Sequence, residues 1–267
     1  MIHISNNVYL QDAGYDGNPI IGYQSIVTSS NVEADSSDAD FPVVNLANEQ
    51  THQYWVSDST STQYVYINQS SSVVDYVGIA RHNFGTGGIA YQLQGSDGSS
   101  PEVWSNITTE KTPSNDTAII EFFDAATYAR FRLKLTPAST EPQIAHIKLG
   151  TALVLQRSIY VGHKPVTLNR RTDVIRNTSE NGQFLGIIQK RQYLMTSVDM
   201  DLITPAFYRT YVDPFVEHAI TGAFFFAWRP VGYPLEVGYG WTDGDISPKN
   251  DKPNGMMAFS FNMKAVS

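Results

Sequence analysis

The stretch from Phe41 to Leu135 decides the fold, and its segment Phe131-Arg-Leu-Lys-Leu135 shows the pattern most clearly. Three apolar residues there share one face, and the two cations between them share the other. A half-buried strand has this period of two because successive side chains point to opposite faces of a sheet. Similar runs, such as Tyr91-Gln-Leu-Gln94, recur between short clusters of Gly, Ser, Asn and Asp. This spacing is typical of an antiparallel sandwich or barrel.

The order of these segments resembles that of the discoidin-like, galactose-binding-like domain. The resemblance covers residues 28–150 and implies a jelly-roll β-sandwich there. The chain departs from the family at Asn68-Gln69, where an Asp-Leu-Gly turn is common, and it lacks the cysteine pair that often joins the ends of the domain. The resemblance therefore implies the fold but not the family's metal or ligand sites. The matching segments are Asn45-Leu46, Trp55-Val-Ser-Asp58, Tyr64-Val-Tyr-Ile67, Val74-Asp-Tyr-Val-Gly-Ile-Ala80 with His82-Asn83, Gln94-Gly-Ser-Asp-Gly98 before Trp104, and Ala129-Arg-Phe-Arg-Leu133.

The composition favours a β-rich protein with large contact surfaces. Charged residues make up 16% of the chain, and 15 Tyr, 13 Phe and 4 Trp are present, which suits strands and flat interfaces. The chain has no cysteine, so disulfides and thiolate metal sites are excluded. The N-terminal residues show no secretory signal, and no apolar run approaches the ~18 residues of a membrane helix. We therefore expect no membrane insertion.

Charge is distributed unevenly along the chain. Residues 1–150 carry 6 Lys and Arg against 16 Asp and Glu, whereas residues 151–267 carry 12 against 10. The acidic half would repel nucleic acid, because such binding depends on neutralising phosphates. The change near residue 150 also predicts two domains: a discoidin-like sandwich over 28–150, and a β-sandwich with one short helix over 151–267.

Residues 1–27 read as two short strands, Val8-Tyr-Leu10 and Pro19-Ile-Ile-Gly-Tyr23, joined by a Gly-containing loop. These strands could begin the first domain. Equally, they could form an arm that pairs with the second domain or with a neighbouring chain. The polar loop that follows carries Glu33, Asp35, Asp38 and Asp40. Calcium is conceivable there, but the spacing does not match a calcium-binding loop. We interpret it as a solvated acidic loop and expect no bound metal and no cofactor.

Two features of the first domain suit sugar binding. Arg81-His82-Asn83 ends a strand and enters a Gly-rich loop, and these side chains suit hydrogen bonding to hydroxyl groups as well as plain turn formation. Trp55 and Trp104 have flat faces on which a sugar ring can stack. Both lie beside predicted strands, where a large aromatic side chain belongs more often to the core. The candidate glycan site is therefore Arg81, His82 and Asn83.

The second half combines cations with one helix signal. Thr204-Pro205 is typical of a helix start, because Thr is a favoured N-cap and Pro suits the first helical position. Pro214 must kink that helix or restart it at Asp213. Clustered cations suit an acidic partner, including the acidic half of a neighbouring copy, as well as a solvated strand face. Seven of them form the candidate oligomer interface: Arg157, Lys164, Arg170, Arg171, Arg176, Lys190 and Arg191.

This half also resembles tail-tip and distal-tail-like proteins of long-tailed bacteriophages. The segments that carry the resemblance are the basic β-region, the Pro-led helix, Phe224-Phe-Phe-Ala-Trp-Arg-Pro230 and Tyr233-Pro-Leu-Glu-Val237. The resemblance implies a homo-oligomeric ring around the tail tube, with tube and hub proteins as partners. It also implies a virion location after synthesis in the bacterial cytoplasm.

The residues give little sign of catalysis. His-Glu-x-x-His and Gly-x-Ser-x-Gly are absent from the sequence. Asp213 and Glu217 lie four apart on one predicted helix, which does not place two carboxylates across a cleft. We therefore predict a non-enzymatic structural virion protein that contacts host-surface glycan through its first domain. The alternatives are a stand-alone carbohydrate-binding module or adhesin, and a polysaccharide-degrading enzyme.

Overall fold

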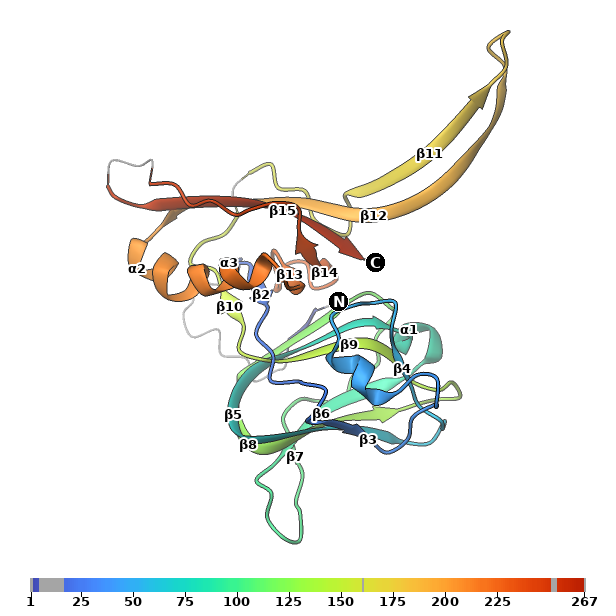
Figure 1. Cartoon of the computed structure of the whole chain (residues 1–267). Coiled ribbons are helices and arrows are strands. Elements are labelled where there is room, and N and C mark those ends of the chain that lie inside the picture. Colours follow the sequence, from blue (N-terminus) through green and yellow to red (C-terminus); the bar gives the residue numbers. More distant parts are fainter. Residues whose placement is uncertain (1, 5–16, 160, 251–253, 267) are drawn as a thin grey trace.

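The computed structural model describes residues 2–4, 17–159, 161–250 and 254–266. They form two predominantly antiparallel sheets and a helical segment (Figure 1), so the predicted all-β class is confirmed. One sheet folds over into a sandwich, formed by residues 24–150. The other has a helix on one face and is called the helix-backed sheet; it contains residues 17–22, 153–159, 161–250 and 254–266. The predicted strand Val8–Leu10 lies outside the described residues.

Two long strands, β5 (Gln63–His82) and β8 (Ile119–Thr136), build both layers of the sandwich. The first part of β5 pairs with the last part of β8, and its second part pairs with the start of β8. The pairing register shifts between Asn68 and Ser72, where the two strands turn from one layer into the other (Figure 1). One pair of strands therefore forms both faces of the core.

Shorter strands complete each layer. The outer layer adds β3 (Val32–Ala34), β6 (Ala90–Ser96) and β7 (Ser105–Asn106). The layer that faces the helix-backed sheet adds β9 (Gln143–Gly150), β4 (Trp55–Val56) and the parallel strand β1 (Ile2–Ile4). Two short helices, η1 (Val43–Ala47) and α1 (Phe84–Gly87), lie in the connections. Trp55, Tyr91 and Phe131 are fully buried between the layers.

The helix-backed sheet has the strand order β10-β2-β13-β14-β15-β12-β11. Its strand β2 (Ile20–Gly22) precedes the sandwich in sequence, so the sandwich is inserted into this sheet. The strands of residues 1–27 are therefore shared between the two parts, since β1 pairs in the first sheet and β2 in the second. The other strands are β10 (Leu153–Val154), β11 (Arg170–Thr178), β12 (Phe184–Ile203), β13 (Phe224–Ala227), β14 (Val237–Thr242) and β15 (Met257–Val266).

The helical segment begins where the sequence predicts. The Thr204 hydroxyl accepts a hydrogen bond from the Phe207 amide at 3.4 Å, and Pro205 opens α2 (Pro205–Phe207). A π-helical turn, η2 (Tyr208–Val212), joins it to α3 (Asp213–Ala219). The wider turn falls just before Pro214, which has no amide hydrogen to donate. The buried side of this segment packs on one face of the sheet through Tyr208, Val212 and Phe215.

Strand β13 is buried on both faces. Phe224 and Phe226 point toward the helix, whereas Phe225 and Ala227 pack against the sandwich. The ring of Phe225 lies so close to Gly78 that a Cβ there would be 2.5 Å from it. The glycine therefore permits the close approach of the two parts. The sequence predicts a β-sandwich over 151–267, but the described part of this region contains one sheet. The helical segment covers one face of that sheet, and the first domain covers the other.

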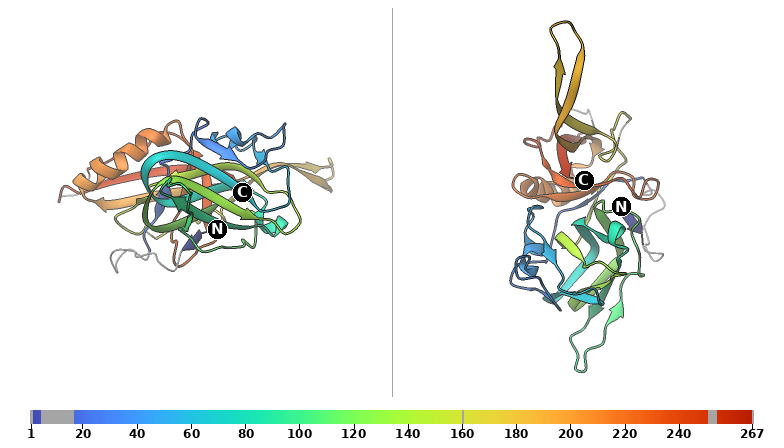
Figure 2. Two further views of the ribbon diagram at one scale, coloured as in Figure 1. Left: turned by 90° about the horizontal axis from the view of Figure 1, so that it is seen from below. Right: turned by 90° about the vertical axis from the view of Figure 1, so that its right-hand side faces the viewer.

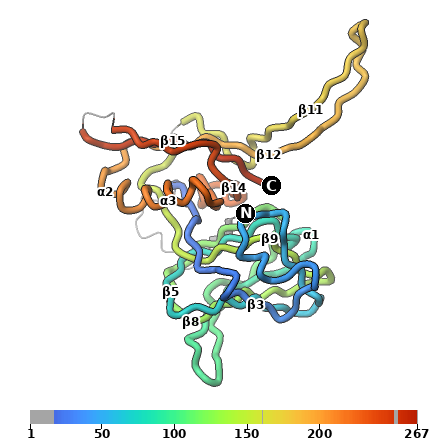
Figure 3. Tube along the Cα trace, in the orientation of Figure 1, coloured from blue at the N-terminus to red at the C-terminus, as the bar shows by residue number. Residues whose placement is uncertain are grey.

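The outer ends of β11 and β12 leave the body as a two-stranded ribbon (Figures 1 and 2). We call residues 170–191 the arm. Figure 3 shows that the arm and the sandwich lie at opposite ends of the molecule. The two strands pair with each other along the whole length of β11, from the pair Arg170 and Leu194 to the pair Thr178 and Phe184. Five large apolar side chains of the arm are exposed: Ile175, Phe184, Leu185, Ile187 and Ile188.

Candidate functional site

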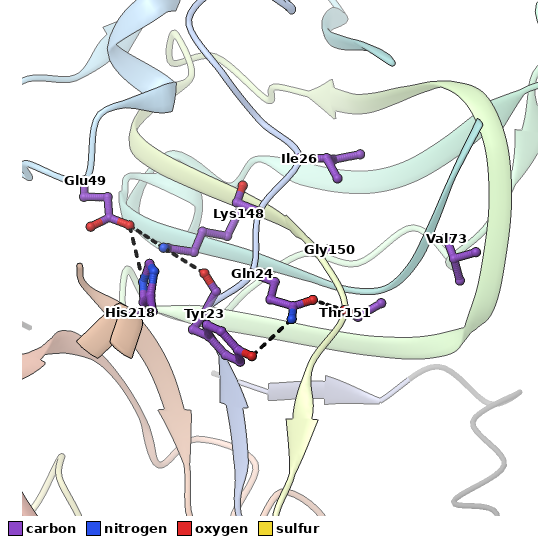
Figure 4. A pocket seen from close by; sticks show the side chains of 10 residues that line it. Tyr23, Gln24, Ile26, Glu49, Val73, Lys148, Gly150, Thr151 and His218 are labelled. Atoms are coloured by element: carbon purple, nitrogen blue, oxygen red, sulfur yellow. Dashed lines mark hydrogen bonds and ion pairs between the residues drawn. The ribbon is translucent and has the colours of Figure 1, made fainter. Parts of the chain in front are cut away.

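A pocket of about 510 Å³ opens between the sandwich and the helix-backed sheet (Figure 4). At its edge, Lys148 is buried and donates hydrogen bonds to the Glu49 carboxylate and, at 3.1 Å, to the carbonyl oxygen of Tyr23. Gln24 bridges the neighbouring polar groups, because its amide donates to Tyr23 Oη and its oxygen accepts from Thr151. The polar side chains around the pocket therefore bond mainly to one another.

Glu49 joins the two parts of the molecule. Its carboxylate accepts a hydrogen bond from the Ala223 amide at 2.6 Å, and its carbonyl oxygen accepts one from the Tyr239 hydroxyl at 2.9 Å. His218 Nε2 lies 3.8 Å from the same carboxylate. Burial raises the pKa of Glu49, but the Lys148 ammonium and the hydrogen bonds outweigh it, so the pKa is lowered overall. The carboxylate thus stays ionised and fastens the two parts together.

An aromatic and cationic surface covers the outer face of the sandwich. Arg132 lies between two rings, with its guanidinium carbon 4.1 Å from the centre of Tyr64 and 4.2 Å from that of Trp104. Arg130 lies 5.7 Å from the ring of Tyr66 and 5.8 Å from that of Trp104. All five side chains are half-buried. We call Tyr64, Tyr66, Trp104, Arg130 and Arg132 the aromatic–arginine surface.

Planar polar groups surround this surface. Arg130 donates to both carboxylate oxygens of Glu102 at 2.9 Å and to Asn68 Oδ1 at 2.7 Å. Arg132 donates to Gln94 Oε1 at 2.7 Å. Such bidentate and charge-assisted contacts fix the guanidinium planes. The surface is therefore held in place before any ligand arrives.

Sequence reasoning missed most of these residues. The prediction of a core tryptophan is confirmed for Trp55 but wrong for Trp104, which lies on the outer face because its segment reaches only the sheet edge. A signal was present in the i, i+2 spacing of the two tyrosines and the two arginines. The structure adds the register that places Tyr66 opposite Arg132.

The candidate residues Arg81, His82 and Asn83 lie in different environments. His82 is buried: its Nε2 donates to the Thr117 carbonyl at 2.8 Å, and its Nδ1 accepts from the Phe84 amide at 3.2 Å. Asn83 bonds to the backbone of residues 141 and 143. Burial lowers the pKa of His82 to about 4. Only Arg81 of the three is exposed, and its role in sugar binding stays a prediction.

The seven cations of the candidate oligomer interface do not form one cluster. Arg157 lies on the body and donates to the Leu202 carbonyl at 2.7 Å. Lys164 precedes the arm and lines a small surface pocket with Arg171. Arg191 pairs with Asp173 across the base of the arm. The other cations, Arg170, Arg176 and Lys190, are exposed along the arm, and the interface itself stays a prediction.

The remaining acidic candidates show no ligand geometry. In the acidic loop, Asp35 accepts from the Tyr64 amide at 3.0 Å and Asp38 from the Asp40 amide at 2.8 Å. Across the described residues, no three His, Asp or Glu side chains are grouped as a metal site would require. Asp213 and Glu217 are exposed on α3. Within the same part of the chain, no helix has the length and apolar character needed to span a membrane.

Comparisons with known proteins give matches among solved structures. No protein-family model matches the chain, and no curated protein matches its sequence. Chitosan-binding module 1 of a chitosanase/glucanase from Paenibacillus sp. IK-5 is 18% identical, with a TM-score of 0.40, over 47% of this chain and 98% of the module. The Clostridium perfringens module CpGH89CBM32-5, in complex with GalNAc-β-1,3-galactose, is 10% identical, with a TM-score of 0.41, over 48% of this chain and 99% of that one.

A third solved structure is much longer than the part of it that matches this chain. It is the Ruminococcus gnavus GH29 fucosidase in complex with fucose, which is 12% identical with a TM-score of 0.41. The match covers 49% of this chain and only 27% of the fucosidase. At these identities and TM-scores, none of the three shows what this chain binds.

Proposed function

We propose that this chain is a non-catalytic glycan-binding protein and that the aromatic–arginine surface is its sugar-binding site. The observation that carries the proposal is the arrangement of three aromatic rings and two fixed guanidinium groups on one outer face. Buried aromatic residues stabilise a core, whereas half-exposed ones beside polar groups are typical of binding sites.

The chemistry of the surface suits neutral or weakly polar sugars. The apolar C–H face of a sugar ring stacks on an aromatic ring, and Trp104 offers the largest one. Arg130, Glu102 and Gln94 present planar polar groups to neighbouring hydroxyls. Because these groups already hold each other in position, little side-chain entropy is lost when a sugar binds.

Calorimetric titration of the full-length chain with oligosaccharides chosen from a glycan array tests this proposal. We expect binding that weakens about 5- to 30-fold in Trp104→Ala, because a stacking face contributes on the order of 1–2 kcal/mol. Val103→Ala, a change at the exposed neighbouring residue, is the matched control and retains the wild-type affinity. An array without any bound glycan, or equal affinity of Trp104→Ala and the wild type, overturns the proposal.

A second candidate function, assembly into a larger structure, is favoured by the arm. An isolated two-stranded ribbon is marginally stable in water, and exposed apolar side chains grouped on one projection indicate an interaction surface. The more specific form of this candidate is a distal-tail-like ring component of a bacteriophage tail tip. Its partners would then be further copies and the tube and hub proteins, and its location the virion.

Light scattering on the full chain and on an arm-shortened variant tests this second candidate. In the variant, residues 175–188 are replaced by Asn-Gly, a two-residue hairpin turn that is then flanked by the paired residues Val174 and Gln189. We expect a defined oligomer for the wild type and a monomer of unchanged melting temperature for the variant. A wild-type monomer at high concentration, or an oligomer that survives the shortening, excludes the arm as the contact between copies.

A further inference from the structure

A second groove, of about 360 Å³, lies where the sandwich, the base of the arm and the C-terminal strand meet. In Figure 1 the end of β15 lies between β12 and the sandwich. Arg81 reaches the groove from the end of β5, and Trp241 from the end of β14. The other residues that line it are Arg191, Gln192, Tyr193, Lys264, Ala265 and Val266.

The sheet register explains why an aromatic ring and a cation lie side by side in this groove. Trp241 is directly opposite Lys264 in the β14–β15 pair, and such cross-strand neighbours place their side chains on the same face. The next pair on the same face, Tyr239 and Val266, packs against the sandwich. The groove thus continues the interface between the two parts, but Trp241 is 47% exposed at its edge.

Among the described residues that line this groove, three are cations and none carries a carboxylate. Lys264 pairs with Asp243 at 2.8 Å, and Arg191 pairs with Asp173, both outside the groove lining. Arg81 has a backbone φ of 54°, a left-handed conformation that costs energy for a residue with a Cβ. Such local strain is found more often at functional sites.

We propose that this groove binds a sugar residue that bears a carboxylate. The proposal rests on the glycan-binding function and adds a separate site with a separate ligand class. The exposed indole of Trp241 provides a stacking face for the sugar ring. Guanidinium groups match the planar geometry of a carboxylate, so Arg81 and Arg191 supply the charge-assisted hydrogen bonds.

Titration of the full-length chain with a hexuronic acid oligosaccharide, and with its carboxyl-reduced neutral counterpart, tests the proposal. We expect the acidic probe to bind at least ~10-fold more tightly, since one charge-assisted contact contributes about 1.5–3 kcal/mol. Trp241→Ala and Arg81→Gln each lower the affinity for the acidic probe by ~10-fold or more. Arg176→Gln, which removes an exposed cation on the arm, leaves that affinity unchanged.

Trp104→Ala separates this site from the aromatic–arginine surface. It weakens the binding of neutral sugars but leaves the acidic probe bound in the groove, so either site can fail without the other. Equal binding of the acidic and neutral probes overturns the proposal, as does an unchanged affinity in Trp241→Ala. Equally tight binding of poly-glutamate or single-stranded DNA also overturns it, because charge alone would then explain the contact. Melting temperatures within a few degrees of the wild type show that the variants are folded.

Discussion

Two apolar runs of similar composition differ in burial: one lies in the core and the other is exposed on the arm. Phe224-Phe-Phe-Ala227 forms β13, and its three phenylalanines are fully buried between the helix and the sandwich. Phe184-Leu-Gly-Ile-Ile188 lies in the arm, where Phe184 is 68% and Ile188 58% exposed. The first run is enclosed on both faces, whereas the second contacts only its partner strand.

The difference shows that apolar content alone does not separate a core from a contact surface. Burying a large apolar side chain contributes about 1.5–3 kcal/mol to the free energy of folding. The run in β13 supplies that energy to the chain itself. The apolar side chains of the arm would gain this free energy only on contact with another surface. They therefore contribute little to the stability of the isolated chain.

Truncating one phenylalanine in each run tests whether the two runs contribute differently to stability. We expect Phe225→Ala to lower the free energy of unfolding by about 3–5 kcal/mol, because it opens a cavity against Gly78 and Tyr239. Phe184→Ala, the matched control, should change it by no more than about 0.5 kcal/mol. Urea denaturation at neutral pH measures both. Similar losses in the two variants would show that the arm is part of the folded core.

Mild acid should weaken the interior but not the arm. Burial lowers the pKa of His82 and of His146 to about 4, against a usual value of 6.5. The unfolded chain therefore takes up protons first as the pH falls, and stability that is complete above about pH 6.5 is lost toward pH 4. From about pH 7 to pH 5 we expect a loss of about 2 kcal/mol for each histidine.

Urea titrations at several pH values check this expectation. Replacing His82 by Gln should remove that residue's share of the pH dependence, whatever it does to the absolute stability. A free energy of unfolding that is flat between about pH 7 and pH 5 would contradict the neutral, buried state of both rings.

The sequence predicts those parts of the fold that depend on local pattern. The alternation in Phe131–Leu135 correctly gives a half-buried strand, and Thr204-Pro205 correctly gives the helix start. Both are set within a few residues. The all-β class follows in the same way, since it needs only the period of each segment and the turns between them.

What depended on distant pairing could not be predicted. β2 lies in the second sheet because Phe225 and Phe226 pair with it, more than 200 residues along the chain. Trp241 and Lys264 become neighbours only through the register of β14 and β15. The exposure of Phe184 could not be predicted either. A short apolar run indicates a buried strand, and only the surrounding structure shows that nothing covers it.

The smallest of the expected effects concerns the charges of the two regions. Glu49→Gln keeps the shape of the side chain but leaves the buried ammonium of Lys148 without its counter-ion. We expect a loss of about 2 kcal/mol, less than for a fully enclosed pair because Glu49 is about one-third exposed. Glu180→Gln, at the exposed end of the arm, should stay within about 0.5 kcal/mol of the wild type.

A double variant shows whether that loss comes from the unpaired charge. Lys148→Met in the Glu49→Gln background removes the buried ammonium, so the double variant should be more stable than Glu49→Gln alone. Because the pKa of Glu49 is lowered in the folded chain, the wild-type advantage over Glu49→Gln is present above about pH 4.5 and disappears as the pH falls further. A double variant less stable than the single one would mean that Lys148 acts through its bond to the Tyr23 carbonyl instead, and that the two parts are joined by packing rather than by charge.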